Sequence, residues 1–419
     1  MPARETAWLS SRQASQRLGV KLATLYAYAS RGLITSLPRD GEHARLYSSD
    51  DVERLRTRHA ARSGHGPVAA AALRFGEPVL ETRISDVGRD GPRYRGLLAT
   101  DLCRAGVSFE RVAELLWTGQ LPEAPGAALE LRGDRARIWS LLAGHAALPK
   151  MALILSALAL ADEDRHAASD AAELGRARAL FHCLAEAPAR RPRRVQAKAR
   201  VAGTLLAALR VPPNSSLLES VDRALVLCAE HELNASTFAA RVAASAGADL
   251  YACLGAAVNT LSGSAHGGMC DRVEALIASI GNRARAARTV NEWLARGQQV
   301  PGFGHPLYAD GDPRAALLLE LAAEHGARSD PARTAFALLE AMKRGGHPSP
   351  TLDAGLVTLC HCLELPAGSA ASIFAVGRSA GWVAHALEQR ASGSLLRPRA
   401  RYVGVAADTF VMAARGPEE

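Results

Sequence analysis

The sequence predicts an all-α fold for most of the chain, preceded by a small basic module at the amino terminus. Three observations support this prediction. Hydrophobic residues make up 48% of the 419 residues but aromatic residues only 5%, and alanine, which loses no side-chain entropy in a helix, is abundant. The formal net charge of +8 is concentrated near one end. A segment containing Gly and Pro then separates that end from a long region rich in Ala and Leu.

The basic charge lies mainly in residues 1–65. This segment holds eleven Lys and Arg residues and six acidic residues, a net charge of +5, whereas the rest of the chain carries +3. Charge gathered at one end predicts a small domain with an anionic partner. A solvated basic tail is the alternative, but the residue pattern of the segment favours a folded domain.

Two short helices are predicted at the start of this domain. Either Ser10 or Ser11 can cap the first helix, and Gly19 ends it. A second amphipathic stretch covers residues 21–30, and Gly32 can end it with a positive φ. The tight turn between them is typical of a helix-turn-helix.

A wing and a third helix are predicted to follow. Residues 38–41 contain Pro, Asp and Gly and form a turn, residues 45–47 form a short strand, and a capped helix runs through Val52 and Leu55. This order is the plan of a winged helix-turn-helix, whose second helix enters the major groove of DNA. The side chains predicted to contact DNA are Lys21, Thr24, Tyr26, Tyr28 and Arg45.

The segments GVKLATLYAYASRGLI and ARLYSSDDVERL resemble the winged helix-turn-helix of the MerR and excisionase group. The resemblance runs from Leu9 to Leu55 and implies that residues 9–55 bind duplex DNA. Modules of this type also mediate protein contacts, so a docking or oligomerisation element is the alternative. We expect the domain to span residues 1–60 and a linker to span residues 61–74.

Several classes of protein are excluded for the rest of the chain. The sequence has no HExxH, Walker or GxGxxG motif. The seven cysteines are spread thinly, and Cys360 with Cys362 is too little for zinc, so no metal site is expected. The apolar run at 151–161 is shorter than the ~20 residues that span a bilayer. The start lacks the apolar stretch of a signal peptide, so we expect a cytoplasmic protein without membrane contact.

Three histidines occur where a side chain can approach a ligand. His266 lies in SGSAHGG and His305 in PGFGHP, and Gly or Pro holds each of these loops. His231 lies in the polar segment AEHELNASTF between two apolar helices. Each could instead be a loop histidine with its hydrogen bonds satisfied within the protein. Three of them in one Ala-rich chain favour a ligand site.

A carboxylate and three arginines add to this pattern. Asp353 follows the start of an apolar helix, where helix capping is its alternative role. Arg314, Arg378 and Arg397 stand alone in small or apolar surroundings. A guanidinium binds a carboxylate or phosphate bidentately, although an ion pair within the protein is the alternative for each. These residues suit the polarisation of carbonyls and the binding of an organic acid, and they do not by themselves name a reaction.

From about Phe75 to about Thr409 the chain resembles the citrate synthase family. The matching blocks, in the family's order, are YRG, FERVAELL, HELNASTF, SAHGG, PGFGHP with DPR, TLDAG, and GRSAGWVAHALEQ followed by LLRPRARYVG. The resemblance implies a citrate synthase fold with a large helical domain at residues 75–266 and 368–419. A small helical domain at residues 267–367 would close over the substrates.

The resemblance also implies the catalytic residues, which are His266, His305 and Asp353. Asp353 would take a proton from the methyl group of acetyl-CoA while His266 donates a hydrogen bond to the thioester oxygen. His305 would polarise and protonate the ketone of oxaloacetate as the carbon–carbon bond forms. Hydrolysis would then release citrate and CoA. Acetyl-CoA would be a co-substrate, and no resident cofactor is expected.

Other residues would hold the substrates, with Asp312 in a supporting role. Arg397 would reach into the site of a neighbouring subunit, which implies a homodimer. The substrate-binding residues implied by the resemblance are His231, Asn234, Arg314, Arg378 and Arg397. The loop implied to lie against the adenine end of coenzyme A contains Gly302, Phe303 and Gly304.

The chain departs from the family pattern at several positions. Met269, Cys270 and Asp271 follow the HGG block, where many members have Ala-Asn-Glu. Pro306 stands where many members have Arg, and Ala309 stands where a basic residue often meets a CoA phosphate. A 2-methylcitrate synthase that uses propionyl-CoA is therefore one alternative. Another is a transcriptional regulator whose synthase-like body senses an acyl-CoA or oxaloacetate without turnover.

Overall fold

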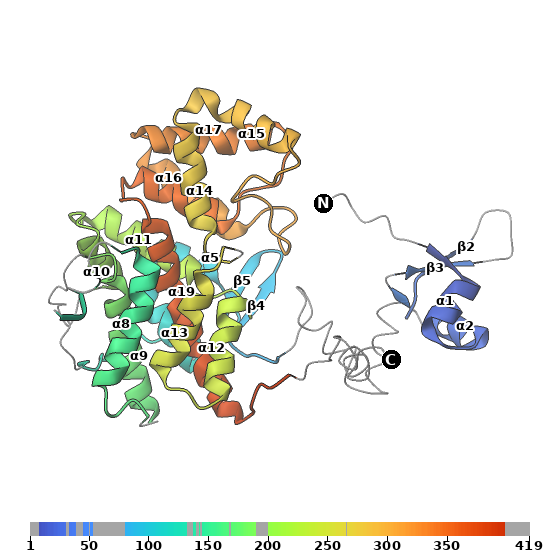
Figure 1. Ribbon diagram of the computed structural model, residues 1–419, viewed down its shortest axis with the longest axis horizontal. Coiled ribbons are helices and arrows are strands. Elements are labelled where there is room, and N and C mark those ends of the chain that lie inside the picture. Colours follow the sequence, from blue (N-terminus) through green and yellow to red (C-terminus); the bar gives the residue numbers. More distant parts are fainter. Residues whose placement is uncertain are drawn as a thin grey trace, which may run out of the picture. The chain divides into compact units, whose positions relative to one another are not determined.

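A computed structural model of the protein describes residues 8–30, 33–38, 45–49, 51–52, 80–131, 137–139, 142, 145–166, 169–189, 200–264 and 266–398. The chain divides into two compact units, Met1–Glu81 with Arg397–Glu419, and Thr82–Leu396. Figure 1 shows the strands and helices of each unit. The predicted linker at 61–74, Gly32 and the third helix beyond Val52 lie outside the described residues, and the predicted domain limits stay predictions.

The first unit contains a three-stranded antiparallel sheet and two helices. Its elements are β1 (Trp8–Ser10), α1 (Ser11–Leu18), α2 (Leu22–Ser30), β2 (Ser36–Pro38) and β3 (Arg45–Ser48). The strand order is β1-β3-β2. Ser10 caps α1 by accepting a hydrogen bond from the backbone of Gln13, and the Gln13 side chain accepts one from Ser10 in return. Gly19 ends α1 with a φ of 66°, so both ends of α1 agree with the sequence prediction.

Strand β1 was not predicted. It pairs with β3, where Leu9 lies opposite Tyr47, and it closes one side of the small core. The wing strand was predicted at residues 45–47, and β3 extends it by one residue. The buried core residues of this unit are Leu9, Ala14, Leu18, Leu25, Ile34, Tyr47 and Val52.

The second unit opens with a small antiparallel sheet that the all-α prediction did not contain. Its strands are β4 (Ser85–Gly88), β5 (Gly91–Tyr94) and β6 (Leu97–Leu98). Arg95 and Gly96, the two residues between β5 and β6, both have positive φ, as a tight two-residue turn between paired strands requires. Tyr94 donates from its hydroxyl to the carbonyl of Val226, so this sheet is joined to the helical core.

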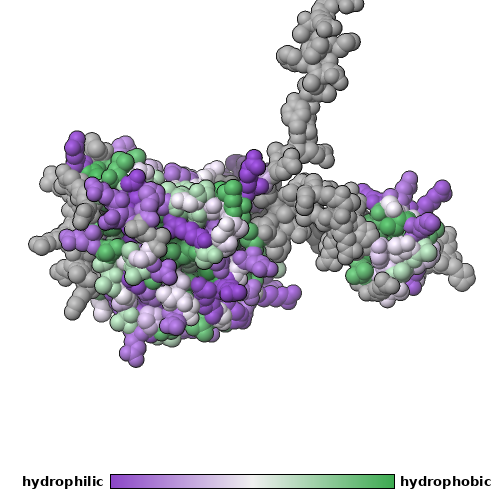
Figure 2. Space-filling view, turned by 90° about the horizontal axis from the view of Figure 1, so that it is seen from below, coloured by the Kyte–Doolittle hydropathy of each residue, from purple (hydrophilic) through white to green (hydrophobic). Residues whose placement is uncertain are grey.

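The other described elements of the second unit are helical. They are α5 (Ala99–Arg104), α6 (Phe109–Thr118), α8 (Ala147–Ala161), α9 (Asp170–Ala185), α10 (Val201–Ala208), α11 (Ser215–Cys228), α12 (Ala235–Ser245), α13 (Leu250–Leu261), α14 (Met269–Ile280), α15 (Ala286–Ala295), α16 (Pro313–His325), α17 (Asp330–Arg344), α18 (Leu352–Cys362) and α19 (Ser369–Ser392), with a 3-10 turn at Arg283–Arg285. None of the described helices has the length and apolar character of a membrane span. On the face drawn in Figure 2, hydrophobic residues are interspersed among hydrophilic ones.

Helix α19 is the central element of the second unit. It packs against α6, α11, α12 and α13, and Figure 1 shows it running through the middle of the helices. Small residues allow this close packing: a Cβ atom at Gly377 would lie 2.7 Å from the Cβ of Cys228. Helices α14, α15, α16 and α17 gather at one end of this unit (Figure 1).

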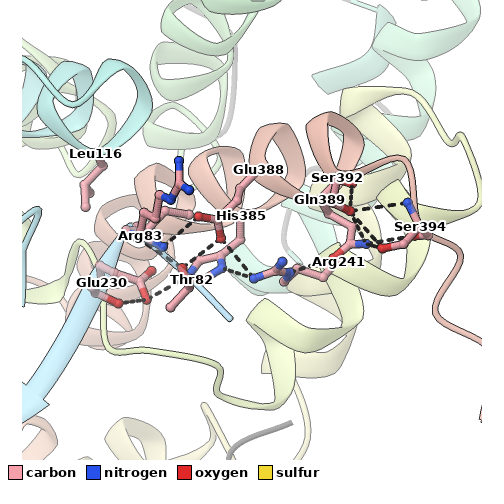
Figure 3. Close-up of polar contacts among 12 residues, drawn as sticks. Thr82, Arg83, Leu116, Glu230, Arg241, His385, Glu388, Gln389, Ser392 and Ser394 are labelled. Atoms are coloured by element: carbon pink, nitrogen blue, oxygen red, sulfur yellow. Dashed lines mark hydrogen bonds and ion pairs between the residues drawn. The ribbon is translucent and has the colours of Figure 1, made fainter. Parts of the chain in front are cut away.

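A polar network ties the first residues of the second unit to α19 (Figure 3). Glu388 accepts hydrogen bonds from the Thr82 hydroxyl and from the Arg83 backbone, each at 2.8 Å. The same carboxylate pairs with Arg241 of α12 at 3.0 Å, and Arg241 also donates to Gln389 at 2.9 Å. One carboxylate therefore joins the chain entering this unit to two of its helices.

We expect Glu388→Ala to lower the free energy of unfolding by about 2 kcal/mol, because the substitution removes the carboxylate from a guanidinium that is already withdrawn from water. The Arg241 side chain is only 4% exposed. Glu388→Gln keeps an oxygen acceptor and should lose less. Urea unfolding measures both, and equal stability of the wild type and Glu388→Ala would contradict this account.

Candidate active site

A buried ion pair lies at the centre of the candidate site. Asp312 caps α16 by accepting a hydrogen bond from the Arg314 backbone at 3.0 Å. Its two oxygens also accept from Nε and Nη2 of the Arg314 side chain, at 3.0 and 2.8 Å. Leu352, the first residue of α18, donates its backbone N–H to the same carboxylate at 3.2 Å. Asp312 therefore fixes the starts of two helices, and the second of them carries Asp353.

The charge of this pair is maintained although both side chains are buried. Burial acts against each ionised form, but the opposite charge of the partner outweighs it, so the pKa of Asp312 is lowered and the pKa of Arg314 is raised. Atom Nη1 of Arg314 is buried and has no hydrogen-bond partner among the described residues. A buried N–H group of this kind is a donor available to an anionic ligand.

Two of the predicted histidines meet a tyrosine beside this pair. Nε2 of His231 lies 2.8 Å from the Tyr308 hydroxyl. The ring centroids of His231 and His305 are 5.3 Å apart, and those of His305 and Tyr308 are 4.8 Å apart. The Arg314 guanidinium lies over the Tyr308 ring at 5.6 Å. Burial and the charge of Arg314 lower the pKa of both histidines, so both are neutral at pH 7.

The loop that carries His305 is pinned to the residues before α18. Gly302 accepts a hydrogen bond from the Thr351 backbone at 2.8 Å, and the Gly304 backbone donates to Ser349 at 2.9 Å. Both glycines have φ above 80°, a conformation that other residues rarely adopt. The Leu307 backbone donates to Nδ1 of His305 at 3.2 Å. The ring proton of neutral His305 therefore lies on Nε2.

His266 lies at the amino end of α12. Its Nε2 accepts from the backbone N–H of Ser236 at 3.3 Å and lies 2.8 Å from the Ser236 hydroxyl. Because a backbone N–H only donates, the ring proton of neutral His266 lies on Nδ1. Burial, with the charge of Arg378, lowers the pKa of His266 to about 4. Asn234 caps α12 at Thr237, and its Nδ2 is buried without a partner among the described residues.

Asp353 is a buried carboxylate in the first turn of α18. Burial raises its pKa, which makes the ionised form a stronger base than a carboxylate in water. Cys270 donates its S–H to one oxygen at 3.3 Å, and the Thr351 hydroxyl donates to the other at 3.4 Å. The helix cap itself is Thr351, so Asp353 is not the capping residue that its alternative role would require.

Arg378 of α19 is a second buried cation. Its Nε donates to the carbonyl of Cys228 at 2.8 Å, and no other hydrogen bond joins its guanidinium to the described residues. Burial lowers its pKa, opposed by the charge of Glu230. Glu230 is itself buried, with one oxygen 3.2 Å from Nε2 of His385 (Figure 3). The outer nitrogens of Arg378 can therefore bind a further anion.

Direct contacts and electrostatic interactions connect six of the predicted residues in the second unit: His231, His266, His305, Asp353, Arg314 and Arg378. Gly302, Phe303 and Gly304 lie in the His305 loop. Arg397 belongs to the first unit and is not placed at this site, so its role stays a prediction. A cavity of about 490 Å³ lined by α6 and α9 contains none of these residues.

Sequence reasoning missed Tyr308 as a member of the site and gave Cys270 no role. Tyr308 could have been found because it lies three residues after His305 in the same Gly- and Pro-rich loop. Cys270 lies four residues after His266, but its contact with Asp353 joins residues 83 positions apart in sequence. Local spacing carries no signal for such a contact.

The residues predicted to contact DNA lie on α2 and the wing of the first unit. Lys21, Tyr26 and Arg45 are exposed, whereas Thr24 and Tyr28 are half-buried. The Arg45 side chain donates to the Ser36 hydroxyl of the neighbouring strand at 3.1 Å. Four of the five residues belong to or directly precede α2, as a recognition helix requires.

The second unit is mostly helical. Its candidate site combines two buried arginines, three neutral histidines and a buried carboxylate, as in an enzyme that acts on an anionic substrate. The family model "Citrate synthase, C-terminal domain" matches residues 74–399, and the model "MerR HTH family regulatory protein" matches residues 9–67. The chain therefore belongs to the citrate synthase family and carries a MerR-type helix-turn-helix at its amino terminus.

Known relatives agree with this family. The chain is 32% identical over 347 residues to "Putative citrate synthase 2" of Mycobacterium tuberculosis, covering 78% of this chain and 91% of the relative. It is also 32% identical over 331 residues to the 2-methylcitrate synthase of the same organism, covering 74% and 84%. The solved citrate synthase of Pyrobaculum aerophilum matches with a TM-score of 0.69 and 25% identity, over 79% of this chain and 93% of that one.

The lowered pKa of buried His266 predicts a pH dependence of stability. The folded pKa of about 4 lies below the unfolded value of 6.5, so the unfolded chain binds more protons between these values. The contribution is fully present above pH 6.5 and is lost as the pH falls towards 4. We expect the wild type to lose more unfolding free energy than His266→Asn between pH 7.5 and pH 5. Equal losses, measured by urea unfolding at the two pH values, would contradict the lowered pKa of His266.

Proposed function

We propose that the protein is a citrate synthase that condenses acetyl-CoA with oxaloacetate and hydrolyses the product to citrate and CoA. The observation that carries the proposal is the pairing of two sets of groups. Buried donors on Arg314 and Arg378 suit a dicarboxylate, and the buried carboxylate of Asp353 suits the removal of a weakly acidic proton. Membership of the citrate synthase family supports the same reaction.

Oxaloacetate would be bound by the two arginines and His231. Nη1 of Arg314 and the outer nitrogens of Arg378 would donate to its carboxylates. Nε2 of His231 contacts the Tyr308 hydroxyl in the structure, and this contact would be exchanged for one to the substrate. The positive charge that lowers the pKa of His231 is the charge that the dianion would balance.

Proton positions support the roles proposed for the two catalytic histidines. The proton on Nδ1 of His266 would be donated as a hydrogen bond to the thioester oxygen while Asp353 takes a methyl proton. The enolate formed in this way would attack the ketone carbon of oxaloacetate, and the proton on Nε2 of His305 would pass to the ketone oxygen. Closure over the substrates would exclude water until the citryl thioester is hydrolysed.

The proposal includes the choice between acetyl-CoA and propionyl-CoA as the co-substrate. The relatives named "Putative citrate synthase 2" and "2-methylcitrate synthase" are each 32% identical to this chain, so propionyl-CoA is the second candidate co-substrate. We propose a homodimer because α8 exposes the large apolar side chains of Leu153 and Leu160, at 55% and 84%. Arg397 would then complete the site of the neighbouring subunit.

We expect the purified chain to release free thiol from acetyl-CoA when oxaloacetate is added. Asp353→Asn should lower the rate by at least about 100-fold, because a positioned base contributes at least that factor. Asp330→Asn, a change at the start of α17, is the matched control and should keep the wild-type rate. Propionyl-CoA in parallel gives the acyl preference. A wild-type rate equal to that of Asp353→Asn with both thioesters would exclude the proposed enzyme activity. It would favour a transcriptional regulator that senses an acyl-CoA or oxaloacetate without turnover.

We also propose that residues 9–55 bind duplex DNA, which the MerR-type match and the exposed Lys21 and Arg45 support. The full chain should bind duplex DNA with an affinity that falls steeply with salt, because bound phosphates release counterions. A chain beginning at Pro67 should lose this binding, and Lys21→Ala with Arg45→Ala should weaken it. Equal affinity of the full and shortened chains, measured by fluorescence anisotropy, would leave a protein-docking role for the module.

A further inference from the structure

A buried thiol contacts the carboxylate proposed as the catalytic base. Cys270, the second residue of α14, is 1% exposed, and its Sγ lies 3.3 Å from Oδ1 of Asp353. The Thr351 hydroxyl reaches the other oxygen at 3.4 Å. Both oxygens of the carboxylate therefore accept hydrogen bonds from neutral donors, and each donor comes from a different part of the chain.

We propose that Cys270 is a positioning residue that orients the Asp353 carboxylate for removal of the methyl proton. This role rests on the proposed function, because it assigns Asp353 as the base. A carboxylate in the first turn of a helix can rotate about two side-chain bonds. A donor on each oxygen selects one orientation and holds it before the substrate arrives.

The backbone around Cys270 is fixed by the turn that carries His266. A Cβ atom at Gly267 would lie 2.4 Å from the Leu261 carbonyl, so this position accepts only glycine without a shift. Helix α14 begins two residues later. One rigid turn therefore places both the proposed donor to the thioester and the thiol that contacts the base.

A thiol is a suitable donor because it is weak and stays protonated. Burial raises the pKa of Cys270 well above its usual value, and the nearby Asp353 charge raises it further. The charge of Arg314 of α16 lowers the pKa of Asp353, and the Asp353 charge in turn contributes to the raised pKa of Cys228 of α11. An amide at position 270 would donate a stronger hydrogen bond and make Asp353 a weaker base. The thiol thus fixes the carboxylate while leaving its pKa raised.

The kinetic test compares Cys270→Ala and Cys270→Ser with the wild type. Loss of the hydrogen bond in Cys270→Ala should lower kcat about three- to tenfold, with the KM for oxaloacetate unchanged within about twofold. The acid limb of the kcat profile should move to higher pH, because Asp353 loses a donor that favours its ionised form. Cys270→Ser restores a donor and should recover most of the rate. Cys362→Ala, another buried cysteine, is the control and should leave the profile in place.

A merely structural role would lower stability without moving the pH profile. Wild-type kcat and an unmoved acid limb in Cys270→Ala would overturn the proposal, and so would equal loss of kcat in Cys270→Ala and Cys270→Ser with an unmoved limb.

An infrared measurement tests the contact without turnover. The difference between wild-type and Cys270→Ala spectra isolates the S–H stretching band of Cys270 from those of the other cysteines. This band should move to higher frequency in Asp353→Asn, whose neutral oxygen is a weaker acceptor. An unmoved band would overturn the contact. The band could move in Asp353→Asn while the wild type turns over neither acetyl-CoA nor propionyl-CoA. That pair of results would establish the contact and overturn the proposed function, together with the positioning role that rests on it.

Discussion

The buried ion pair between Asp312 and Arg314 is the interaction on which the candidate site depends. The same carboxylate caps α16, accepts hydrogen bonds from Nε and Nη2 of Arg314 and accepts the first backbone N–H of α18. The arginine in turn stacks on Tyr308, which touches His231 and His305. Desolvating a buried pair of this kind costs free energy, and the hydrogen bonds of the two side chains offset that cost here. Nη1 of Arg314 is buried without a hydrogen-bond partner among the described residues. This N–H group is the donor suited to a ligand.

Burial beside a fixed positive charge explains the state of the other titratable groups. It keeps His231, His266 and His305 neutral, so each can offer a hydrogen bond without carrying a charge of its own. Burial also raises the pKa of Asp353, against the opposing charge of Arg314, and so strengthens that carboxylate as a base. The proton positions follow from backbone donors at Ser236 and Leu307, which belong to the fold rather than to the site. Ordinary helix and loop geometry thus produces a set of groups suited to enolate chemistry.

The sequence was sufficient to predict the helical class and the site residues that lie on Gly- and Pro-rich loops. Such loops can be recognised from the Gly and Pro residues next to the functional side chain. Serine caps and Gly19 likewise gave the ends of α1. The β4–β6 sheet was missed because its strands have two to four residues, too few for a period to be recognised. The partners of Asp353 and Arg378 were missed for a different reason. Cys270 and the Cys228 carbonyl reach them from helices distant in sequence, and such contacts depend on the packing of α14 and α11 against α18 and α19.

We propose that Asp353 and His266 together generate an enolate from an acyl-CoA. Exchange of the acetyl-CoA methyl protons with deuterium oxide, followed by proton NMR in the presence of an unreactive dicarboxylate analogue of oxaloacetate, tests this claim most directly. We predict exchange by the wild type, and no exchange above the uncatalysed rate by Asp353→Asn. Exchange by Asp353→Asn at the wild-type rate would contradict the assignment of the base.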